Sequence, residues 1–146
     1  MVARLVWDQK VAGSNPVTLI QIMITQKRLD KFLETGKDQC LSIERSKKHC
    51  SLIIYKNQIV SVGINGIGKT HPEAKRIGYR YDEVHSELDA VLKCKYKKNL
   101  TLLNLRFNRF GEMRIARPCQ LCMPWCKMYF DSIYYTMPEG VVKLEY

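Results

Sequence analysis

The chain has 146 residues, 46% of them hydrophobic and 26% charged, which suits one folded domain and excludes a disordered or collagen-like chain. No apolar stretch approaches the roughly 20 residues that a membrane helix needs, so the sequence predicts no membrane-spanning segment. Lys and Arg outnumber Asp and Glu by 24 to 14, and the net charge of +10 favours a phosphate-bearing partner, whether a nucleotide, a nucleic acid or a membrane surface.

The first 24 residues are predicted to lie outside the main domain. Gly13-Ser14-Asn15-Pro16 is a turn signal between short apolar runs that show no sustained period, so we expect 1–24 to be a peripheral extension. The peptide GSNPVT is also what the T-arm of a transfer-RNA gene gives when it is read as codons. A second hypothesis is therefore that the native chain starts at Met23, and a native peptide from upstream of Met23 would disprove it.

From Thr25 onward, hydrophobic periodicity and turn residues predict alternating helices and strands. Thr25 is the predicted N-cap of a helix near 25–46, in which Gly36 marks the place for a break. The run SLIIYKNQIVSVGIN at 51–65 predicts two strands joined at Lys56-Asn57 as a hairpin. The remaining predicted elements are a helix over 82–95, a strand over 100–108, a helix opened by Pro118, and short strands at 133–136 and 141–146.

The order helix, two strands, helix, strand, helix and two strands predicts an α/β fold in which helices cover the faces of one sheet. Residues 25–146 are accordingly expected to form a single domain. Six cysteines without a secretion signal predict a reducing, cytoplasmic compartment. In such a compartment, clustered thiols bind metal more often than they form disulfides.

Two short motifs carry the predicted chemistry. His85-Ser86-Glu87 stands at the start of one predicted helix, and Pro118-Cys119-Gln120-Leu121-Cys122 stands at the start of another. A catalytic zinc takes three protein ligands and keeps one position open for water, and one imidazole with two thiolates is an established set. We therefore predict Zn²⁺ on His85, Cys119 and Cys122. Glu87 follows the histidine by two residues, where it can lie beside the metal without binding it and move protons.

With these motifs the sequence resembles the cytidine/deoxycytidylate deaminase superfamily, in particular its compact phage- and virus-type members. The resemblance covers residues 48–146 and includes a GxN segment (Gly63, Asn65) and a KTHP segment (Lys69 to Pro72) ahead of HxE. It implies a three-layer α/β/α sandwich with a mixed sheet of about five strands. It also implies Zn²⁺ as the cofactor, a homo-oligomer, and a single deaminase domain over 25–146.

The same resemblance implies roles for individual residues. Glu87 would act first as base and then as acid while water attacks C4 of a cytosine ring and ammonia leaves. The Ser86 backbone N–H and the Pro118 carbonyl would hold the pyrimidine edge. Asn65 would contact the sugar, and the alternative for Asn65 is a turn asparagine favoured for its own backbone geometry.

Deoxycytidylate is the preferred substrate, because a basic protein suits a phosphate and the resemblance points to it. Free cytidine and adenosine in transfer RNA are the alternatives, since adenine presents the same amidine at C6. The hypothesis of a different class is a non-catalytic zinc module that binds nucleic acid through the basic clusters at 93–98 and 106–117.

Two features of the sequence allow other interpretations. Residues 63–70 match the phosphate-loop pattern GxxxxGK[ST], but Pro72 and Gly78 leave no room for the long helix that such a loop needs. Cys126 lies one helical turn after Cys122 and is either a fourth metal ligand or, as we favour, a core thiol.

Overall fold

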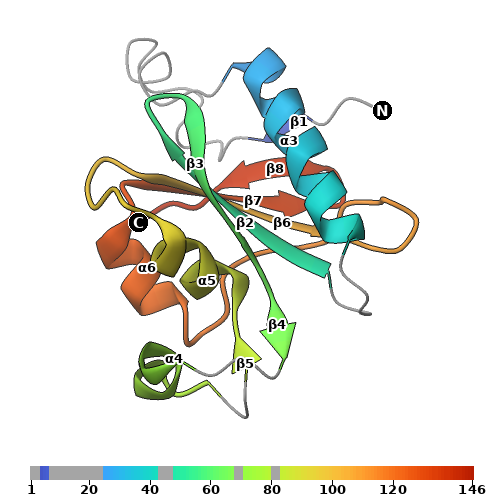
Figure 1. The fold of residues 1–146 in the computed structure, drawn as a ribbon. Coiled ribbons are helices and arrows are strands. Elements are labelled where there is room, and N and C mark those ends of the chain that lie inside the picture. The colour runs from blue at the N-terminus through green and yellow to red at the C-terminus, as the bar shows by residue number, and fades with distance from the viewer. Residues whose placement is uncertain (1–3, 7–24, 43–47, 68–70, 80–82) are drawn as a thin grey trace.

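A mixed sheet of six strands forms the centre of the part of the chain that the structure describes (Figure 1). The structure is a computed structural model and describes residues 4–6, 25–42, 48–67, 71–79 and 83–146. In spatial order the strands of the sheet are β3 (Gln58–Ile64), β2 (Lys48–Tyr55), β6 (Thr101–Phe107), β7 (Ser132–Met137), β8 (Gly140–Lys143) and β1 (Arg4–Val6). A separate two-stranded sheet pairs β4 (Gly66–Ile67) with β5 (Glu83–Val84).

The pairing directions confirm the predicted mixed sheet. β2 is antiparallel to both β3 and β6, whereas β6 and β7 are parallel, and β7 and β8 are antiparallel. The sixth strand, β1, comes from the predicted N-terminal extension and pairs in parallel with β8 at the edge of the sheet. Residues 7–24, which include the turn signal and Met23, lie outside the described residues.

Helices cover both faces of the sheet (Figure 1). α3 (Gln26–Leu41) packs on β2 and β6 at one face, while α5 (Ser86–Lys93) packs on β2 and β3 and α6 (Met123–Tyr129) packs on β7 at the other. A short helix, α4 (Pro72–Ile77), comes between β4 and β5 in the sequence. The predicted three-layer α/β/α sandwich is therefore confirmed. None of the described helices is long and apolar enough to cross a membrane.

The predicted hairpin is also present. Lys56 and Asn57 join β2 to β3 with positive φ angles of 49° and 63°. Two consecutive positive φ angles are typical of a type I′ turn, whose twist matches that of the strands it connects. The hairpin brings the end of β3, where Asn65 follows, back to the start of β2.

The two faces of the sheet are built from alternate residues of the same strands. On β6, Leu103 and Leu105 belong to the core cluster under α3, whereas Leu102 belongs to the cluster under α5 and α6. Residues two apart along a strand share a face, so Asn104 points to the α5 and α6 side with Leu102. The same face of β2 carries the buried Ser51, and polar side chains are thus placed where the two predicted motifs meet.

The helix on the opposite face is continuous, so the predicted break at Gly36 is wrong. Thr25 caps α3 as predicted, its Oγ1 accepting a hydrogen bond from the Arg28 backbone N–H at 3.3 Å. Gly36 is buried against β6, where an added Cβ would lie 1.8 Å from Cδ1 of Leu105. The glycine allows close approach of helix and sheet, and this packing outweighs its low helix propensity.

The last helix begins later than predicted, because Pro118 does not open it. The chain from Cys119 to Cys122 forms a turn, in which the Cys122 backbone N–H donates to the Cys119 carbonyl at 3.1 Å, and α6 starts at Met123. Residues 119–121 are exposed, so this turn has no buried face on which a helix would pack. That face starts with the buried residues Cys122, Cys126 and Phe130, which follow one another at intervals of four.

Candidate active site

Three potential metal ligands meet where α5 and α6 begin. His85 is the residue before α5, and Cys119 and Cys122 lie in the turn before α6. His85 Nδ1 is 3.5 Å from Cys119 Sγ and 3.4 Å from Cys122 Sγ. The three ligand atoms all lie within 4.8 Å of one another. The fold thus brings together the residues that the two sequence motifs predict as a metal site.

The distances between these atoms suit a shared zinc ion. With zinc–nitrogen and zinc–sulfur bonds of about 2.0 and 2.3 Å at a tetrahedral angle, a nitrogen and a sulfur ligand lie about 3.5 Å apart. Both nitrogen–sulfur distances in the structure agree with this value. One imidazole and two sulfurs are also a donor set that Zn²⁺ accepts. His85, Cys119 and Cys122 are therefore the residues that would hold the ion.

The two sulfurs have different surroundings. Cys119 is exposed, and hydrogen bonds from Cys122 and His85 lower the pKa of its thiol to about 4. Cys122 is buried, and its hydrogen bond to Cys119, its burial and the nearby Glu87 carboxylate raise its pKa far above the usual range. Without a metal, one proton therefore stays on the pair of sulfurs, and a metal that binds both must displace it.

Glu87 lies beside the three ligands without belonging to their group. It is the second residue of α5 and is 5% exposed. Its Oε2 accepts a hydrogen bond of 3.6 Å from the Cys122 thiol, and its Oε1 accepts one of 2.6 Å from Asn104 Nδ2. One carboxylate oxygen therefore faces the candidate metal ligands, while Asn104 of the sheet holds the other. This arrangement suits a carboxylate that moves protons near a metal.

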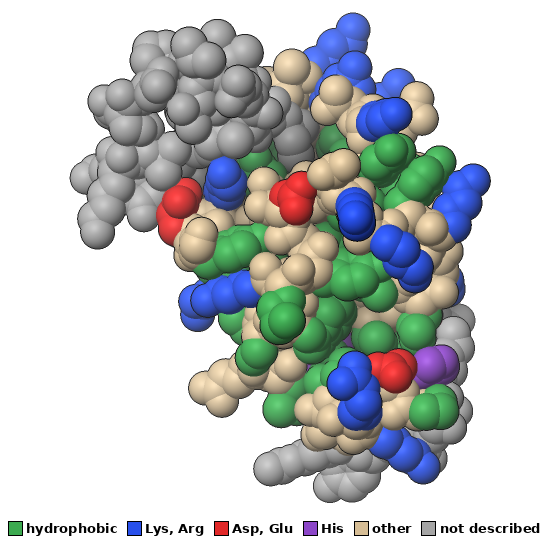
Figure 2. All heavy atoms as spheres, turned by 90° about the vertical axis from the view of Figure 1, so that its left-hand side faces the viewer, with side chains coloured by type: hydrophobic (Ala, Val, Ile, Leu, Met, Phe, Trp, Pro, Cys, Tyr) green, Lys and Arg blue, Asp and Glu red, His purple; other side chains and the backbone are tan. Residues whose placement is uncertain are grey.

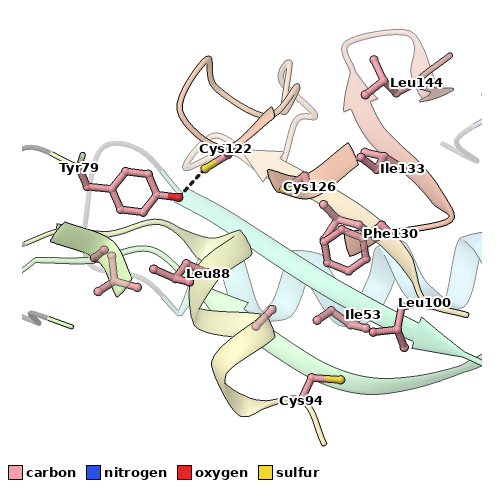
Figure 3. Close-up of a cluster of buried hydrophobic side chains, with 14 residues drawn as sticks. Ile53, Tyr79, Leu88, Cys94, Leu100, Cys122, Cys126, Phe130, Ile133 and Leu144 are labelled. Atoms are coloured by element: carbon pink, nitrogen blue, oxygen red, sulfur yellow. Dashed lines mark hydrogen bonds between the residues drawn. The ribbon is translucent and has the colours of Figure 1, made fainter. Parts of the chain in front are cut away.

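Tyr79 is a part of the site that the sequence motifs do not contain. Its hydroxyl forms a hydrogen bond with Cys122 Sγ (Figure 3), at a distance of 2.7 Å. Its ring stacks on the His85 imidazole with centroids 3.9 Å apart and planes inclined by 8°. Burial raises the pKa of Tyr79, and the Cys122 sulfur raises it further, so the hydroxyl keeps its proton. Tyr79 thus contacts two of the three ligands. A tyrosine in a loop gives no sequence signal for such a role.

Asn104 and Ser51 form a second part of the site that sequence reasoning missed. Asn104 on β6 is 2% exposed, and Ser51 on β2 is fully buried. The Ser51 hydroxyl lies 2.8 Å from the Ser86 hydroxyl and also donates to Asn104 Oδ1. Ser86, Ser51, Asn104 and Glu87 are therefore linked in one buried chain of hydrogen bonds. The available signal was an asparagine between leucines in the run LLNL of this strand.

The residues predicted to bind a substrate lie on the elements that surround the ligands. Asn65 follows β3, and its Oδ1 accepts a hydrogen bond from the His49 backbone N–H at 3.1 Å. Ser86 is the first residue of α5, and the buried Pro118 comes directly before Cys119. The contacts of these three residues with a base or a sugar stay predictions.

The glycine-rich segment at 63–70 does not lead into a phosphate-binding helix among the described residues. α4 has six residues, and the His71 imidazole occupies its start by accepting a hydrogen bond from the Glu73 backbone N–H at 3.1 Å. Gly63 has a packing role instead, because an added Cβ would lie 2.1 Å from the Ser86 carbonyl oxygen. Lys69 and Thr70 of the pattern lie outside the described residues.

Cys126 lies in the core rather than among the metal ligands. It is fully buried in the same cluster as Phe130 and Ile133 (Figure 3), and burial raises the pKa of its thiol. The described group of potential ligand atoms comprises His85, Cys119 and Cys122 and does not include it. These observations favour the core thiol over the fourth ligand.

Basic side chains are distributed over the surface. Figure 2 shows Lys and Arg spread over one side of the molecule rather than gathered in one patch. Four lysines around the end of α5 are all exposed: Lys93, Lys95, Lys97 and Lys98. Lys93 also pairs with Asp89 at 2.8 Å. A distributed positive charge of this kind attracts phosphate without specifying where it binds.

The fold of the chain is similar to that of solved structures. The chain is similar to the crystal structure of dCMP deaminase from the cyanophage S-TIM5 in its apo form, with a TM-score of 0.56, 14% identity, and 79% of this chain and 86% of that chain covered. It is equally similar to the structure of that enzyme in complex with dCMP and dUMP, with a TM-score of 0.54, 15% identity, and 77% and 83% covered. Neither a protein-family model nor the sequence of a curated protein matches the chain. The chain therefore has the same fold as this dCMP deaminase.

Proposed function

We propose that this protein is a zinc-dependent hydrolytic deaminase that converts a cytosine nucleotide or nucleoside to the uracil compound and ammonia, with dCMP as the preferred substrate. The observation that carries the proposal is the convergence of two motifs far apart in the sequence. His85, Cys119 and Cys122 offer zinc a suitable donor set, and the Glu87 carboxylate lies 3.6 Å from Cys122 Sγ. The likeness in fold to a dCMP deaminase that has been seen with dCMP and dUMP supports the choice of substrate.

In the proposed chemistry zinc would activate the water, and Glu87 would carry out the proton transfers. Zinc, when bound, would act as a Lewis acid that lowers the pKa of water to near neutral pH. Glu87 Oε2, which faces the ligand group, would accept a proton from the attacking water and deliver it to N3 of the cytosine ring. The second water proton would then reach the exocyclic amine through the same carboxylate. Water adds its oxygen at C4, the C–N bond breaks, and ammonia leaves.

The rest of the pocket would hold the substrate in position. Ser86 is the first residue of α5, where backbone N–H groups have no partner within the helix and are available to a carbonyl oxygen of the base. The Pro118 carbonyl would accept from the exocyclic amine, and Asn65 would contact the sugar. The net charge of +10 would favour a monophosphate over a free nucleoside.

The test is ammonia release by the zinc-loaded protein from dCMP, deoxycytidine, cytidine and transfer RNA, compared with that by a Glu87→Gln variant. Removal of a general acid and base typically costs 10²–10⁴-fold, so we expect kcat of the variant to fall by about that factor while zinc content and melting temperature stay unchanged. Glu112→Gln, at an exposed position, is the matched control and should behave as the wild type. A Glu87→Gln variant that keeps full activity would refute the mechanism.

The same experiment separates the enzyme from the second candidate function, a zinc module that binds nucleic acid. The exposed lysines around the end of α5 and the charge of +10 are the observations that favour this candidate. If the wild type binds RNA but releases no ammonia from any cytosine or adenine compound, the enzyme proposal is wrong. Release from transfer RNA alone would transfer the proposal from dCMP to a transfer-RNA adenosine substrate.

A further inference from the structure

We infer that Asn104 is the positioning residue for the Glu87 carboxylate, and that it keeps Oε2 directed toward the metal ligands by holding Oε1. This inference rests on the proposed function and adds a residue that neither sequence motif contains. Asn104 lies in the middle of β6, beneath α5, and is 2% exposed. Its Nδ2 is 2.6 Å from Glu87 Oε1, whereas the Cys122 thiol is 3.6 Å from the other carboxylate oxygen.

The orientation of the Asn104 amide is determined by its neighbours. Nδ2 lies within hydrogen-bond distance of Glu87 Oε1 and, at 3.2 Å, of the Ala116 carbonyl oxygen. A carbonyl oxygen only accepts hydrogen bonds, so the nitrogen of the amide must face Ala116. The amide oxygen then faces the Ser51 hydroxyl, which donates to it. Both hydrogens and the oxygen of the amide are thus in use, and a flipped amide would lose these bonds.

The direction of the hydrogen bonds can be followed further, through the hydroxyl groups of Ser51 and Ser86. The Ser51 hydroxyl has one hydrogen and gives it to Asn104 Oδ1, so in the 2.8 Å pair with Ser86 the Ser86 hydroxyl must be the donor. The chain of donors therefore runs from Ser86 to Ser51, to Asn104 and to Glu87. Hydrogen bonds in such a chain polarise one another in the same direction, which strengthens the last bond to the carboxylate.

The geometry explains why this bond matters for the reaction. A glutamate on the first turn of a helix has three rotatable side-chain bonds, and helix packing alone does not fix the rotation of its carboxylate. Asn104 approaches from the rigid centre of the sheet, through β6, which is paired on both sides with β2 and β7. With Oε1 held from below, Oε2 is the oxygen that faces Cys122 Sγ. A site whose side chains come from helices and strands, as Glu87 and Asn104 do, is held more accurately than one built on loops.

A purely structural explanation accounts less well for Asn104. The inward position between Leu102 and the helices would accept an apolar side chain, and a buried amide costs free energy unless every polar atom is paired. One hydrogen-bond partner of the Asn104 amide is the Glu87 carboxylate, and another, Ser51, bonds in turn to Ser86. Both ends of the network therefore lie on the first turn of α5, where the proposed catalytic residue stands.

The experiment compares Asn104→Leu, whose side chain has the same number of heavy atoms and the same branching but no hydrogen-bond donor or acceptor, with Thr136→Val. Thr136 is a fully buried residue of β7 whose hydroxyl donates to the Arg114 carbonyl at 2.8 Å and accepts from the Arg106 backbone N–H of β6 at 3.1 Å. Neither bond involves Glu87, so the control removes two hydrogen bonds beside the same strand without changing the partners of the carboxylate. A misplacement of about 1 Å in a reacting group costs up to about 100-fold. We expect kcat of Asn104→Leu for dCMP to fall by about 10- to 100-fold. Its KM and its zinc content should stay at the wild-type values, and Thr136→Val should keep the wild-type kcat.

The outcomes separate this inference from the proposed function. A wild type without ammonia release refutes the proposed function and with it the inference, whereas an active wild type together with an Asn104→Leu variant of unchanged kcat overturns only the inference. Equal losses of kcat in Asn104→Leu and Thr136→Val also overturn it. If Asn104→Leu does not fold, Ser51→Ala, which removes one donor to Asn104, should lower kcat by about 2- to 10-fold at unchanged KM. An unchanged kcat in Ser51→Ala then counts against the inference.

Discussion

The two faces of the sheet differ in what they bury. The face under α3 is filled by a cluster of apolar side chains from α3 and the strands, including Leu29, Phe32 and Leu105. The face under α5 and α6 has an apolar cluster as well, but at the end near the candidate metal ligands it also buries Glu87 and Asn104. Because both faces use alternate residues of the same strands, a single strand contributes to stability on one side and to the site on the other.

This difference suggests that stability and chemistry can be changed separately. Burial of apolar surface is the main source of stability and is insensitive to direction, so the α3 face tolerates small shifts of its side chains. A proton-transferring site depends on distances of a few tenths of an ångström between polar atoms. Substitutions on the α3 face should therefore change the free energy of unfolding, and those on the other face should change activity or metal binding.

The largest expected effect comes from replacing a ligand, and three cysteines make the comparison. Cys119→Ala should lose stoichiometric zinc and lower the zinc affinity by more than about 100-fold, the upper end of what loss of an outer-shell partner costs. Cys126→Ala, on the buried face of α6, and Cys50→Ala, on the α3 face, should each keep one zinc per chain. Zinc content by elemental analysis and ammonia release are the measurements. Loss of zinc from Cys126→Ala would instead make Cys126 a ligand.

The two motifs were enough to predict the candidate metal ligands, because each motif is local in the sequence. HxE and PCxxC fix the identity and spacing of the ligands within a turn, and the order of the elements fixes a sheet covered by helices on both sides. The start of α6 was predicted at Pro118, five residues too early, because the exposure of residues 119–121 depends on the folded surface. Helix propensity alone does not contain that information.

The contributions of Tyr79 and Asn104 could not be predicted for a related reason. Each of them reaches the site across a long separation in sequence: Tyr79 contacts Cys122, and Asn104 contacts Glu87 from a different layer of the fold. Neither belongs to a spaced pattern with its partner. The role of Asn104 follows from the register of β6 on β2 and from the packing of α5, and that of Tyr79 from where the chain after α4 meets Cys122 and His85. A pattern of residue types specifies neither.

The next prediction uses two glycines, one on each face. An added Cβ at Gly63 would lie 2.1 Å from the Ser86 carbonyl oxygen and 2.4 Å from the Ala90 nitrogen, so Gly63→Ala must push the backbone of α5 away from β3. Overpacking of this kind costs about 1–3 kcal/mol of stability, and the shift should also displace Glu87 and lower kcat. Gly36→Ala meets only the end of the Leu105 side chain, which can rotate. It also gains about 1 kcal/mol of helix propensity.

We therefore expect Gly36→Ala to change stability by less than Gly63→Ala and to leave kcat unchanged. Chemical denaturation gives the free energy of unfolding, and ammonia release at saturating substrate gives kcat. If the two faces have different roles, kcat of Gly63→Ala should be lower than kcat of Gly36→Ala even when both are expressed per folded molecule. Two variants with the same kcat would show that the position of α5 on the sheet does not control the site.

The smallest expected effect concerns Tyr79, which lies on the face under α5 and α6, and is compared with that of a tyrosine in the cluster under α3. Tyr79→Phe keeps the ring that stacks on His85 and removes the hydroxyl 2.7 Å from Cys122 Sγ. A hydroxyl that keeps its proton can donate to a metal-bound sulfur, and loss of such an outer-shell partner typically weakens metal binding by 10–100-fold, so we expect about a 10-fold loss measured by competition with a chelator. Tyr134→Phe is the matched control, since Tyr134 is a buried tyrosine in the cluster under α3 and should not affect zinc. If Tyr79→Phe holds zinc as tightly as the wild type, the contact with Cys122 belongs to the metal-free protein alone, and the stacked ring is what Tyr79 contributes to the site.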